Sequence, residues 1–307
     1  MAIVLGDNQY GKAETHVVRV VRDTARHEIR DLVVSSALRG SFDDAHLTGN
    51  QSAVLPTDTQ KNTVFAFAKQ VGISSPEQLA VALARHFADD VDTVSSARVT
   101  VEEHLWERAV VDGAPHDHTF VQSSQEVRTV AVTVEGGRTH VLSGLTGLVL
   151  LKSTGSEFSG FLVDEYTTLA PTTDRVMATS VSARWRWSSG FSGTDDLADH
   201  DHAYGEVRDV LVSRFGALHS LALQQTLWEM GRSVLETRED IAEIRLSAPN
   251  RHHFPVDLTP FGLDNAGEVF WAADRPYGLI EVEVRRDEAD ADRDASGPAW
   301  RAVPGFL

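Results

Sequence analysis

Residues 57–63 (TDTQKNT) form a dense run of hydroxyl, carboxylate, amide and ammonium side chains. They precede the helix-like sequence FAFAKQVG, and Thr57 and Asp58 are residue types that accept hydrogen bonds from the free N–H groups at a helix start. Those N–H groups and the positive end of the helix dipole can also bind an anion. Taken alone, the segment favours helix capping over anion binding.

A second polar segment, residues 249–253 (PNRHH), follows a stretch of alternating apolar and polar residues and reads as a strand-end turn. Adjacent side chains on an extended chain point to opposite faces, so we expect His252 to enter a site and His253 to stay outside it. A single histidine at the end of a strand is more often structural than catalytic. Asn250 and His252 therefore indicate a site only in combination with other residues.

Four further side chains have useful chemistry but ordinary surroundings. Lys12, before the first expected strand, could be a solvated charge, and Phe158 could be a core aromatic. Arg175 and Gln224 could be surface groups. None of the four indicates a site by itself.

These residues must be positioned by strands and helices, and the first half of the chain predicts both. Apolar stretches at residues 17–21 and 29–34 predict two strands, which a turn-rich segment follows. Apolar residues then alternate with polar ones at residues 97–101 and 130–134, which predicts two more strands. The sequence EGGR at 135–138 follows the second of these strands and is typical of a turn.

Ser75 begins the clearest helix signal of the first half. Pro76 would take the first helical position, and Gln78 stands three residues after the cap, as in a capping box. Apolar residues then recur on one helical face, at Leu79, Leu83 and Phe87.

The second half repeats the order of elements. Strands are predicted at residues 140–151 and 176–187, and a polar loop follows at 188–202. Helical spacing spans 207–215 and 223–234, and alternation returns at 244–246 and 280–284. We therefore expect one strand–helix–strand unit at 10–136, a second at 137–286 and an acidic, solvated C-terminal tail at 287–307.

This order predicts an α+β fold: two tandem units, each with an antiparallel four-stranded sheet and two helices on one face. Such sheets have open edges, and pairing those edges between subunits would close a barrel or tunnel. We therefore expect oligomerisation.

Composition narrows the class of protein. The formal net charge of −17 argues against a nucleic-acid partner, and it requires a local cation for any anionic substrate. There are no cysteines, so disulfides and thiolate chemistry are excluded. The N-terminal sequence resembles neither a signal peptide nor a membrane span, and the final residues PGFL are not a peroxisomal tripeptide. We expect a cytoplasmic protein with no membrane association.

In combination, the segments resemble the urate oxidase family. The shared motifs are YGK at 10–12, TDTQKNT at 57–63, FSGFLVDEYTTL at 158–169, Asp174-Arg175, QQTLW at 224–228 and PNRH at 249–252. They occur in the family's order and spacing from Tyr10 to about Val284. The family's fold is a tandem T-fold, four copies of which close a tunnel, so the resemblance implies a homotetramer with active sites at subunit interfaces.

The resemblance also implies a reaction and a role for each residue. Urate would be oxidised by O2 and water to 5-hydroxyisourate and hydrogen peroxide, without a cofactor. Catalysis would use a proton relay of Lys12, Thr57 and His252. Substrate binding would use Thr57, Asp58, Phe158, Arg175, the backbone N–H of Leu223, Gln224 and Asn250, with Thr57 and Asp58 contributed by a neighbouring subunit.

Three alternatives remain open. His116-Asp117-His118 and Asp199-His200-Asp201-His202 contain His-x-His pairs, which would suit a metal-dependent hydrolase. Both lie in turn-rich sequence without an obvious third ligand, so the sequence favours no metal site. The same scaffold could also be a catalytically silent purine- or pterin-binding tetramer, or an enzyme acting on pterins.

Overall fold

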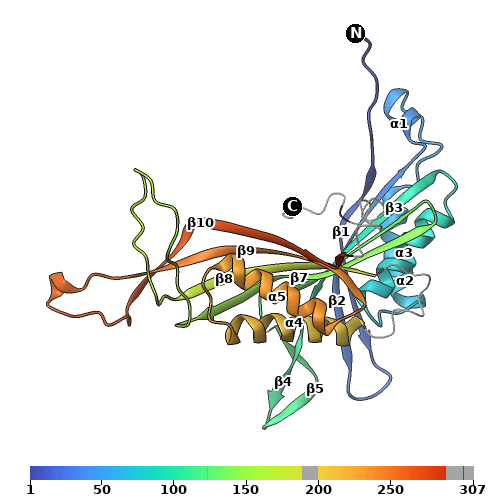
Figure 1. Ribbon diagram of the computed structural model, residues 1–307. Helices are drawn as coiled ribbons and strands as arrows, with labels where there is room; N and C mark the ends of the chain where they lie inside the picture. The colour runs from blue at the N-terminus through green and yellow to red at the C-terminus, as the bar shows by residue number, and fades with distance from the viewer. Residues whose placement is uncertain (123, 189–199, 288–299, 301–307) are drawn as a thin grey trace.

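The computed structural model describes residues 1–122, 124–188, 200–287 and 300 (Figure 1). The first half consists of β1 (Tyr10–Val21), β2 (Glu28–Gly40), α1 (Asp43–Leu47), α2 (Thr57–Gln70), α3 (Pro76–Asp89), β3 (Val94–His104), β4 (Glu107–Val111), β5 (Ala114–Val121) and β6 (Val127–Glu135). The second half consists of β7 (Arg138–Lys152), β8 (Met177–Trp187), α4 (His200–Ala217), α5 (Leu223–Thr237), β9 (Ile241–Pro255), the 3-10 turn η2 (Thr259–Phe261) and β10 (Phe270–Arg285).

Eight strands form one antiparallel sheet in the order β1-β2-β3-β6-β7-β8-β9-β10. The sheet bends strongly, so that β1 and β2 run across the direction of β9 and β10 in Figure 1. The predicted α+β class is confirmed. The sheet of one chain is open, with β1 and β10 at its edges, and closure of a barrel by further copies stays a prediction.

Both helix pairs pack against the apolar side of this sheet. In the first half α2 contacts β1 and α3 contacts β3 and β6, while in the second half α5 contacts β9 and β10. The strands predicted at 97–101 and 130–134 are confirmed as parts of β3 and β6, and Val99 and Val132 are fully buried. On β6 the residues between the valines are buried too, so this strand is covered on both faces. One continuous core joins the two halves.

The signal at Ser75 is confirmed in detail. Its hydroxyl accepts a hydrogen bond from the Gln78 N–H at 3.2 Å, and Leu79, Leu83 and Phe87 are fully buried. The capping box is incomplete, because the Gln78 side chain bonds the hydroxyl of Ser74 instead.

The predicted EGGR turn is also confirmed. Gly136 and Gly137 both have positive φ, as a two-residue hairpin between β6 and β7 requires. The turn falls at the expected boundary between the two units. Because a single sheet and core cross that boundary, the division at 136/137 stays a prediction.

A buried ionic cluster also crosses the boundary. Arg128 on β6 donates to Glu77 of α3 at 2.6 Å and to Asp201 of α4 at 2.5 Å. Arg128 and Glu77 are almost wholly buried, so each charge depends on the other for compensation. The start of α4 is therefore anchored to the first half of the chain.

Three local predictions were wrong. In each case a helix or strand extends beyond its apolar residues into polar sequence. Residues 57–63 do not precede a helix but form the first two turns of α2. Lys12 does not precede the first strand but lies within β1. Residues 249–253 are not a strand-end turn, because β9 continues through them to Pro255.

The sequence did not predict helix α1 or the β4–β5 hairpin, and it placed both His-x-His segments in loops. The turn-rich segment after β2 contains the short helix α1, and the His116–His118 pair lies on the unpredicted β4–β5 hairpin. His200 and His202 belong to α4 rather than to a loop.

The predicted tail at 287–307 lies almost wholly outside the described residues. Within it, Trp300 is described and is not freely solvated: its ring lies 3.9 Å from the Arg245 guanidinium. Among the described helices, none combines the length and apolar character needed to span a membrane.

Candidate active site

A cavity of about 960 Å3 opens where the loop after β7, the start of α5 and the distal parts of β9 and β10 meet. In Figure 1 this loop is the yellow-green excursion beside β9 and β10. The cavity brings together most of the predicted site residues: Phe158, Arg175, Leu223, Gln224, Asn250 and His252.

The first turn of α5 forms one wall. Ala222 occupies the N-cap position in an extended conformation, and no side chain caps the helix. The first helical hydrogen bond runs from the Thr226 N–H to the Ala222 carbonyl, so the N–H groups of Leu223 and Gln224 precede it. The Leu223 side chain is buried in the core, as its place on the apolar helical face predicts.

Arg175 supplies the positive charge of the cavity. Burial lowers the pKa of its guanidinium, and within the described part of the chain no carboxylate lies at ion-pair distance from it. The neighbouring Asp174 accepts a hydrogen bond from the Thr154 hydroxyl at 2.9 Å instead. A half-buried cation without an acidic partner favours binding of an anion.

Phe158 lies beside Arg175, with the guanidinium carbon 5.7 Å from its ring centroid. Two backbone hydrogen bonds of 2.9 Å tie Phe158 to Thr172, which fixes the ring near the cavity. The Phe158 ring is stacked on Phe161, with centroids 5.0 Å apart and planes 15° apart. The sequence did not single out Phe161, although the FSGF spacing could have indicated an aromatic pair.

Asn250 and His252 come from β9. Asn250 is paired with Thr179 of β8 and with Gly278 of β10, at the point where the β9–β10 register becomes irregular. Burial first and the Arg175 charge second lower the pKa of His252, so its imidazole is neutral near pH 7. The ring stacks on Phe254 at 5.5 Å. A neutral, positioned imidazole can accept a proton.

His253 also borders the cavity, against the expectation that it stays outside. Its Nδ1 atom lies 3.1 Å from the carbonyl oxygen of Arg251. The cavity curves round the end of β9, where Phe254 and Pro255 line it too. The alternation of side chains between the two faces of β9 therefore does not keep His253 away from the cavity.

The other predicted residues form a second group, on β1 and the start of α2. Pro56 is the N-cap of α2 without a side-chain cap, so the N–H groups of Thr57 and Asp58 are left open as at α5. Ser36 holds this group together: its hydroxyl bonds Gln60 of α2 at 2.7 Å and accepts from the Lys12 N–H at 3.4 Å.

Asp58 is neutralised within its own helix. Lys61 forms an ion pair with its carboxylate, and the Asn62 amide donates to it at 3.0 Å. The hydrogen bond from Lys61 is the main cause that lowers the Asp58 pKa, and the charge of Lys12 contributes less. Lys12 therefore lies near the start of α2. None of Lys12, Thr57 and Asp58 lines the cavity, so one chain presents two separate groups.

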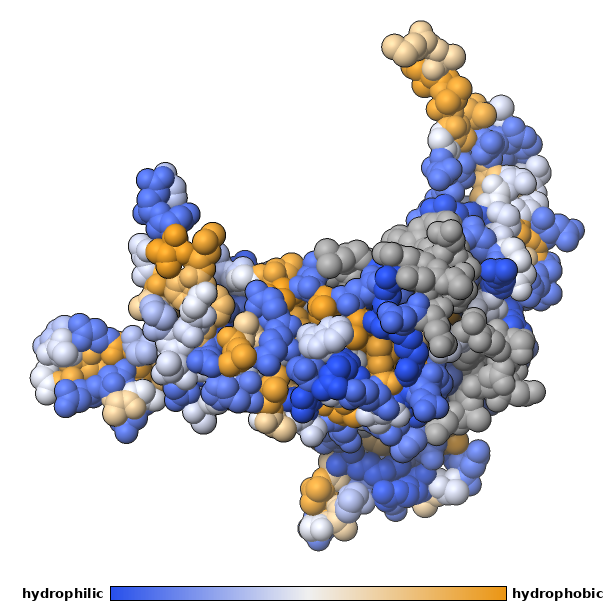
Figure 2. Space-filling model, in the orientation of Figure 1, coloured by the Kyte–Doolittle hydropathy of each residue, from blue (hydrophilic) through white to orange (hydrophobic). Residues whose placement is uncertain are grey.

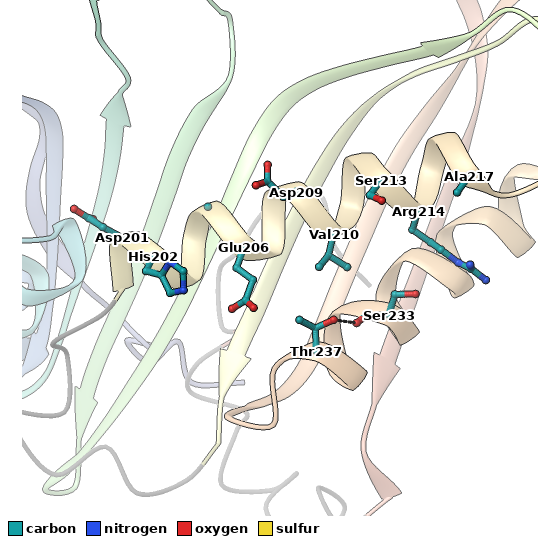
Figure 3. Close-up of a pocket in the computed structure, with 11 residues that line it drawn as sticks. Asp201, His202, Glu206, Asp209, Val210, Ser213, Arg214, Ala217, Ser233 and Thr237 are labelled. Carbon is teal, nitrogen blue, oxygen red and sulfur yellow. Dashed lines mark hydrogen bonds between the residues drawn. The ribbon is translucent and has the colours of Figure 1, made fainter.

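A second hollow, of about 740 Å3, lies between α4 and α5 (Figure 3). Asp201, Glu206 and Asp209 line it, but Arg128 pairs with Asp201 and Arg238 with Glu206. Arg214 there is paired with Glu229 at 2.6 Å. This acidic hollow contains none of the predicted site residues, and its Arg214, unlike Arg175, already has an acidic partner.

Within the described residues, neither His-x-His pair gains a third ligand. The rings of His116 and His118 meet edge to face with centroids 4.4 Å apart, and His200 packs on Trp187 at 4.6 Å. The described residues contain no group of three or more histidine, cysteine, aspartate or glutamate side chains placed to hold a metal ion. Asp199 lies outside the described residues.

Comparison with known proteins bears on both groups. The model of the uricase family matches residues 8–133 and 141–281, which include every residue of the cavity and of the α2 group named above. The chain belongs to the uricase family. The predicted resemblance is confirmed.

Individual members of the uricase family are similar along nearly the whole chain. The uricase of Arthrobacter globiformis is 49% identical over 304 residues, covering 99% of this chain and 96% of that protein. The uricase of Aspergillus flavus is 36% identical over 289 residues, covering 91% and 95%. A crystal structure of the Arthrobacter globiformis uricase has a TM-score of 0.87 at 50% identity, covering 94% of this chain and 96% of that chain.

Proposed function

We propose that this protein is a urate oxidase that converts urate, O2 and water to 5-hydroxyisourate and hydrogen peroxide. Membership of the uricase family supports the substrate and the type of reaction. The observation that carries the proposal is Arg175, a half-buried cation without an acidic partner among the described residues, in a cavity walled by an uncapped helix start.

Urate binding follows from the chemistry of the cavity. Urate is an anion near neutral pH, and Arg175 with the Gln224 amide would hold one edge of its ring in a two-pronged contact. The N–H of Leu223 would donate to the same edge, and Phe158 would stack on the ring. Charge-assisted hydrogen bonds contribute roughly 1.5–3 kcal/mol each, and ring stacking on a base roughly 1–3 kcal/mol. These contacts offset the repulsion from a chain of net charge −17.

The protein's contribution to the reaction is proton transfer and positioning. Urate is electron-rich and can itself donate electrons to oxygen, so the proposed reaction requires no flavin or metal. Asn250 would hold O2 or water against the ring. Lys12 would favour loss of the Thr57 proton, and His252 would pass protons through a water molecule.

Assembly is required because the relay residues lie in two separate groups. We propose a homotetramer in which Thr57, Asp58 and Lys12 of one subunit complete the cavity of its neighbour. Two features support this: β1 and β10 are unpaired sheet edges, and large apolar side chains are exposed on projecting segments. Figure 2 shows this apolar surface on the loop after β7 and on the N-terminal arm. Leu162 and Ile3 are among the exposed residues there.

The direct test is the near-ultraviolet absorbance of urate mixed with the purified protein. We expect the absorbance to decay in air with formation of one hydrogen peroxide per urate, and to persist under nitrogen. The variant Arg214→Ala, which alters a paired arginine of the acidic hollow, should behave like the unmodified protein. Absence of decay and of peroxide would refute the proposal, and turnover of a pterin instead would identify a different enzyme.

A further inference from the structure

We propose that Lys152, the last residue of β7, is a positioning residue of the cavity. It would hold the three segments that carry Phe158, Arg175 and the Leu223–Gln224 turn at fixed distances from one another. This inference rests on the proposed urate oxidation for its kinetic consequences, but the geometry it describes does not depend on the substrate.

The ammonium group of Lys152 binds the connection between α4 and α5. Its Nζ atom donates to the Leu218 carbonyl at 2.7 Å and to the Ser220 hydroxyl at 2.7 Å, and it lies 5.4 Å from the centroid of the Phe215 ring. Leu218 directly follows the end of α4, where a positive charge also stabilises the helix dipole. A lysine is suited to this place because it combines several donors with a positive charge.

Ser220 passes this restraint to the first turn of α5. Its hydroxyl lies 2.7 Å from the hydroxyl of Thr226, which is itself 2.9 Å from the Ala222 carbonyl. Ser220 and Thr226 are fully buried, so no solvent replaces these contacts if one is lost. Ala222 is the N-cap of α5, and the two residues after it line the cavity.

Ser220 also anchors the loop that follows Lys152. The Ser220 N–H donates to the Gly155 carbonyl at 2.9 Å, and the Glu157 N–H donates to the Ser220 carbonyl at 2.8 Å. Between them, the Ser156 carbonyl accepts from the Arg175 N–H at 2.9 Å. The restraint thus reaches the backbone of Arg175 and, one residue beyond Glu157, that of Phe158.

Lys152 is half-buried, and this connection is the main contact that accounts for its position. It does not line the cavity, and among the described residues no carboxylate pairs with it. Burial first and the nearby Arg175 second lower the pKa of its ammonium, so the folded protein holds this charge at a cost. The neutral oxygens of Leu218 and Ser220 offset that cost only while the three segments keep their present arrangement.

The test compares Lys152→Met, which keeps the length of the side chain but removes its donors, with Lys152→Arg, which keeps a charge. We expect Lys152→Met to raise the KM for urate by about tenfold while kcat falls less, and Lys152→Arg to restore part of the loss. Binding of urate under nitrogen should weaken by a similar factor.

Arg238→Met is the matched control. Arg238 is a half-buried cation at the other end of α5, bonded to Glu206 at 2.9 Å and also to Asp240. Its loss should lower the thermal midpoint as Lys152→Met does, but leave the KM for urate unchanged. An equal rise of KM in both variants, or no rise in Lys152→Met, would overturn the proposal.

Hydrogen exchange separates this proposal from the proposed function. In Lys152→Met, and not in Arg238→Met, the amides of Glu157, Arg175 and Ser220 should exchange faster. If the unmodified protein did not oxidise urate, the proposed function would fail while this prediction could still be met. Unchanged exchange at these amides would overturn the positioning role whatever the substrate.

Discussion

The cavity and the α2 group (Lys12, Thr57 and Asp58) each include the start of a helix that lacks a side-chain cap, but their surroundings differ. At α5 the residues with open N–H groups line the cavity, and Arg175 there lacks an acidic partner among the described residues. At α2 they are open to solvent, and the nearest acid, Asp58, is neutralised by Lys61 of the same helix. The first arrangement favours anion binding. We expect the second group to act only when a neighbouring subunit covers it.

Helix α3 shows what these two helices lack. Ser75 has nearly the same extended backbone conformation as Ala222, yet its hydroxyl caps the helix. A serine cap normally stabilises a helix by about 1 kcal/mol. Helices α2 and α5 lack this stabilisation, which leaves the N–H groups of their first turns without a side-chain acceptor.

The largest expected effect on activity comes from disabling one of the two groups and then combining the two disabled variants in one oligomer. We expect Thr57→Ala to lower kcat by roughly 10²-fold or more by breaking the relay, and Arg175→Ala to raise the KM by roughly 10–10²-fold by removing the charged contact. Refolding equal amounts of the two variants together should restore roughly a quarter of the sites, because each variant supplies the group that the other lacks.

Steady-state kinetics of the single variants and of their refolded mixture measure this effect. Each variant refolded alone is the control. If the mixture shows only the average of the two variants, both groups act within one chain and the assignment to separate subunits is wrong. An active monomer would contradict it equally.

The charge of Arg175 should also set the pH range of the reaction, with a moderate effect. Its proximity lowers the His252 pKa, which keeps the imidazole neutral, and able to accept a proton, to lower pH. In Arg175→Gln the His252 pKa should rise. When the pH is lowered, kcat should then begin to fall at a higher pH than in the unmodified protein. The shift should be under about one unit, since burial, the larger cause, remains.

The pH profile of kcat at saturating urate reports this shift. His253→Asn is the control and should leave the acid limb in place, whereas His252→Asn should abolish that limb. If the acid limb instead moved in His253→Asn, the titrating group would be His253 and the assignment to His252 would be wrong.

The smallest effect should come from adding or removing a cap. Ala222→Ser should stabilise α5 but compete with the substrate for its N–H groups, so that the thermal midpoint rises while the KM for urate rises by a few-fold. Ser75→Ala should lower the free energy of unfolding by about 1 kcal/mol without changing the KM. Thermal unfolding and steady-state kinetics check both, and an unchanged KM in Ala222→Ser would show that the open N–H groups of α5 do not bind urate.

The sequence predicted elements well where burial alone determines them. The periodic residues of α3, β3 and β6 are buried as expected, because a core-facing stripe is a local property of a helix or strand. Predictions failed where a polar segment continues the helix or strand next to it. Residues 57–63 are helical and residues 249–253 extended although neither is apolar, and the β4–β5 hairpin carries no strong pattern.

The candidate residues were found through the combination of motifs rather than through any local signal. Arg175, Gln224 and Phe158 are ordinary in sequence, and Phe161, Lys152 and the cavity-facing side of His253 were not foreseen. Lys152 gives the reason: its contacts join residues 66 and 68 positions apart, which no sequence window covers.

The sequence by itself determined the α+β class, the order of elements, the turn between β6 and β7 and the family to which the chain belongs. These depend on periodicity, turn chemistry and motif order, all of which are properties of the linear chain. Only the tertiary structure decided that the candidate residues form two groups, and that Arg175 stands without an acidic partner among the described residues. Burial, pairing and separation of charges arise from which distant segments pack together, and that packing places the charge of Arg175, on which the proposed anion binding depends, in the cavity.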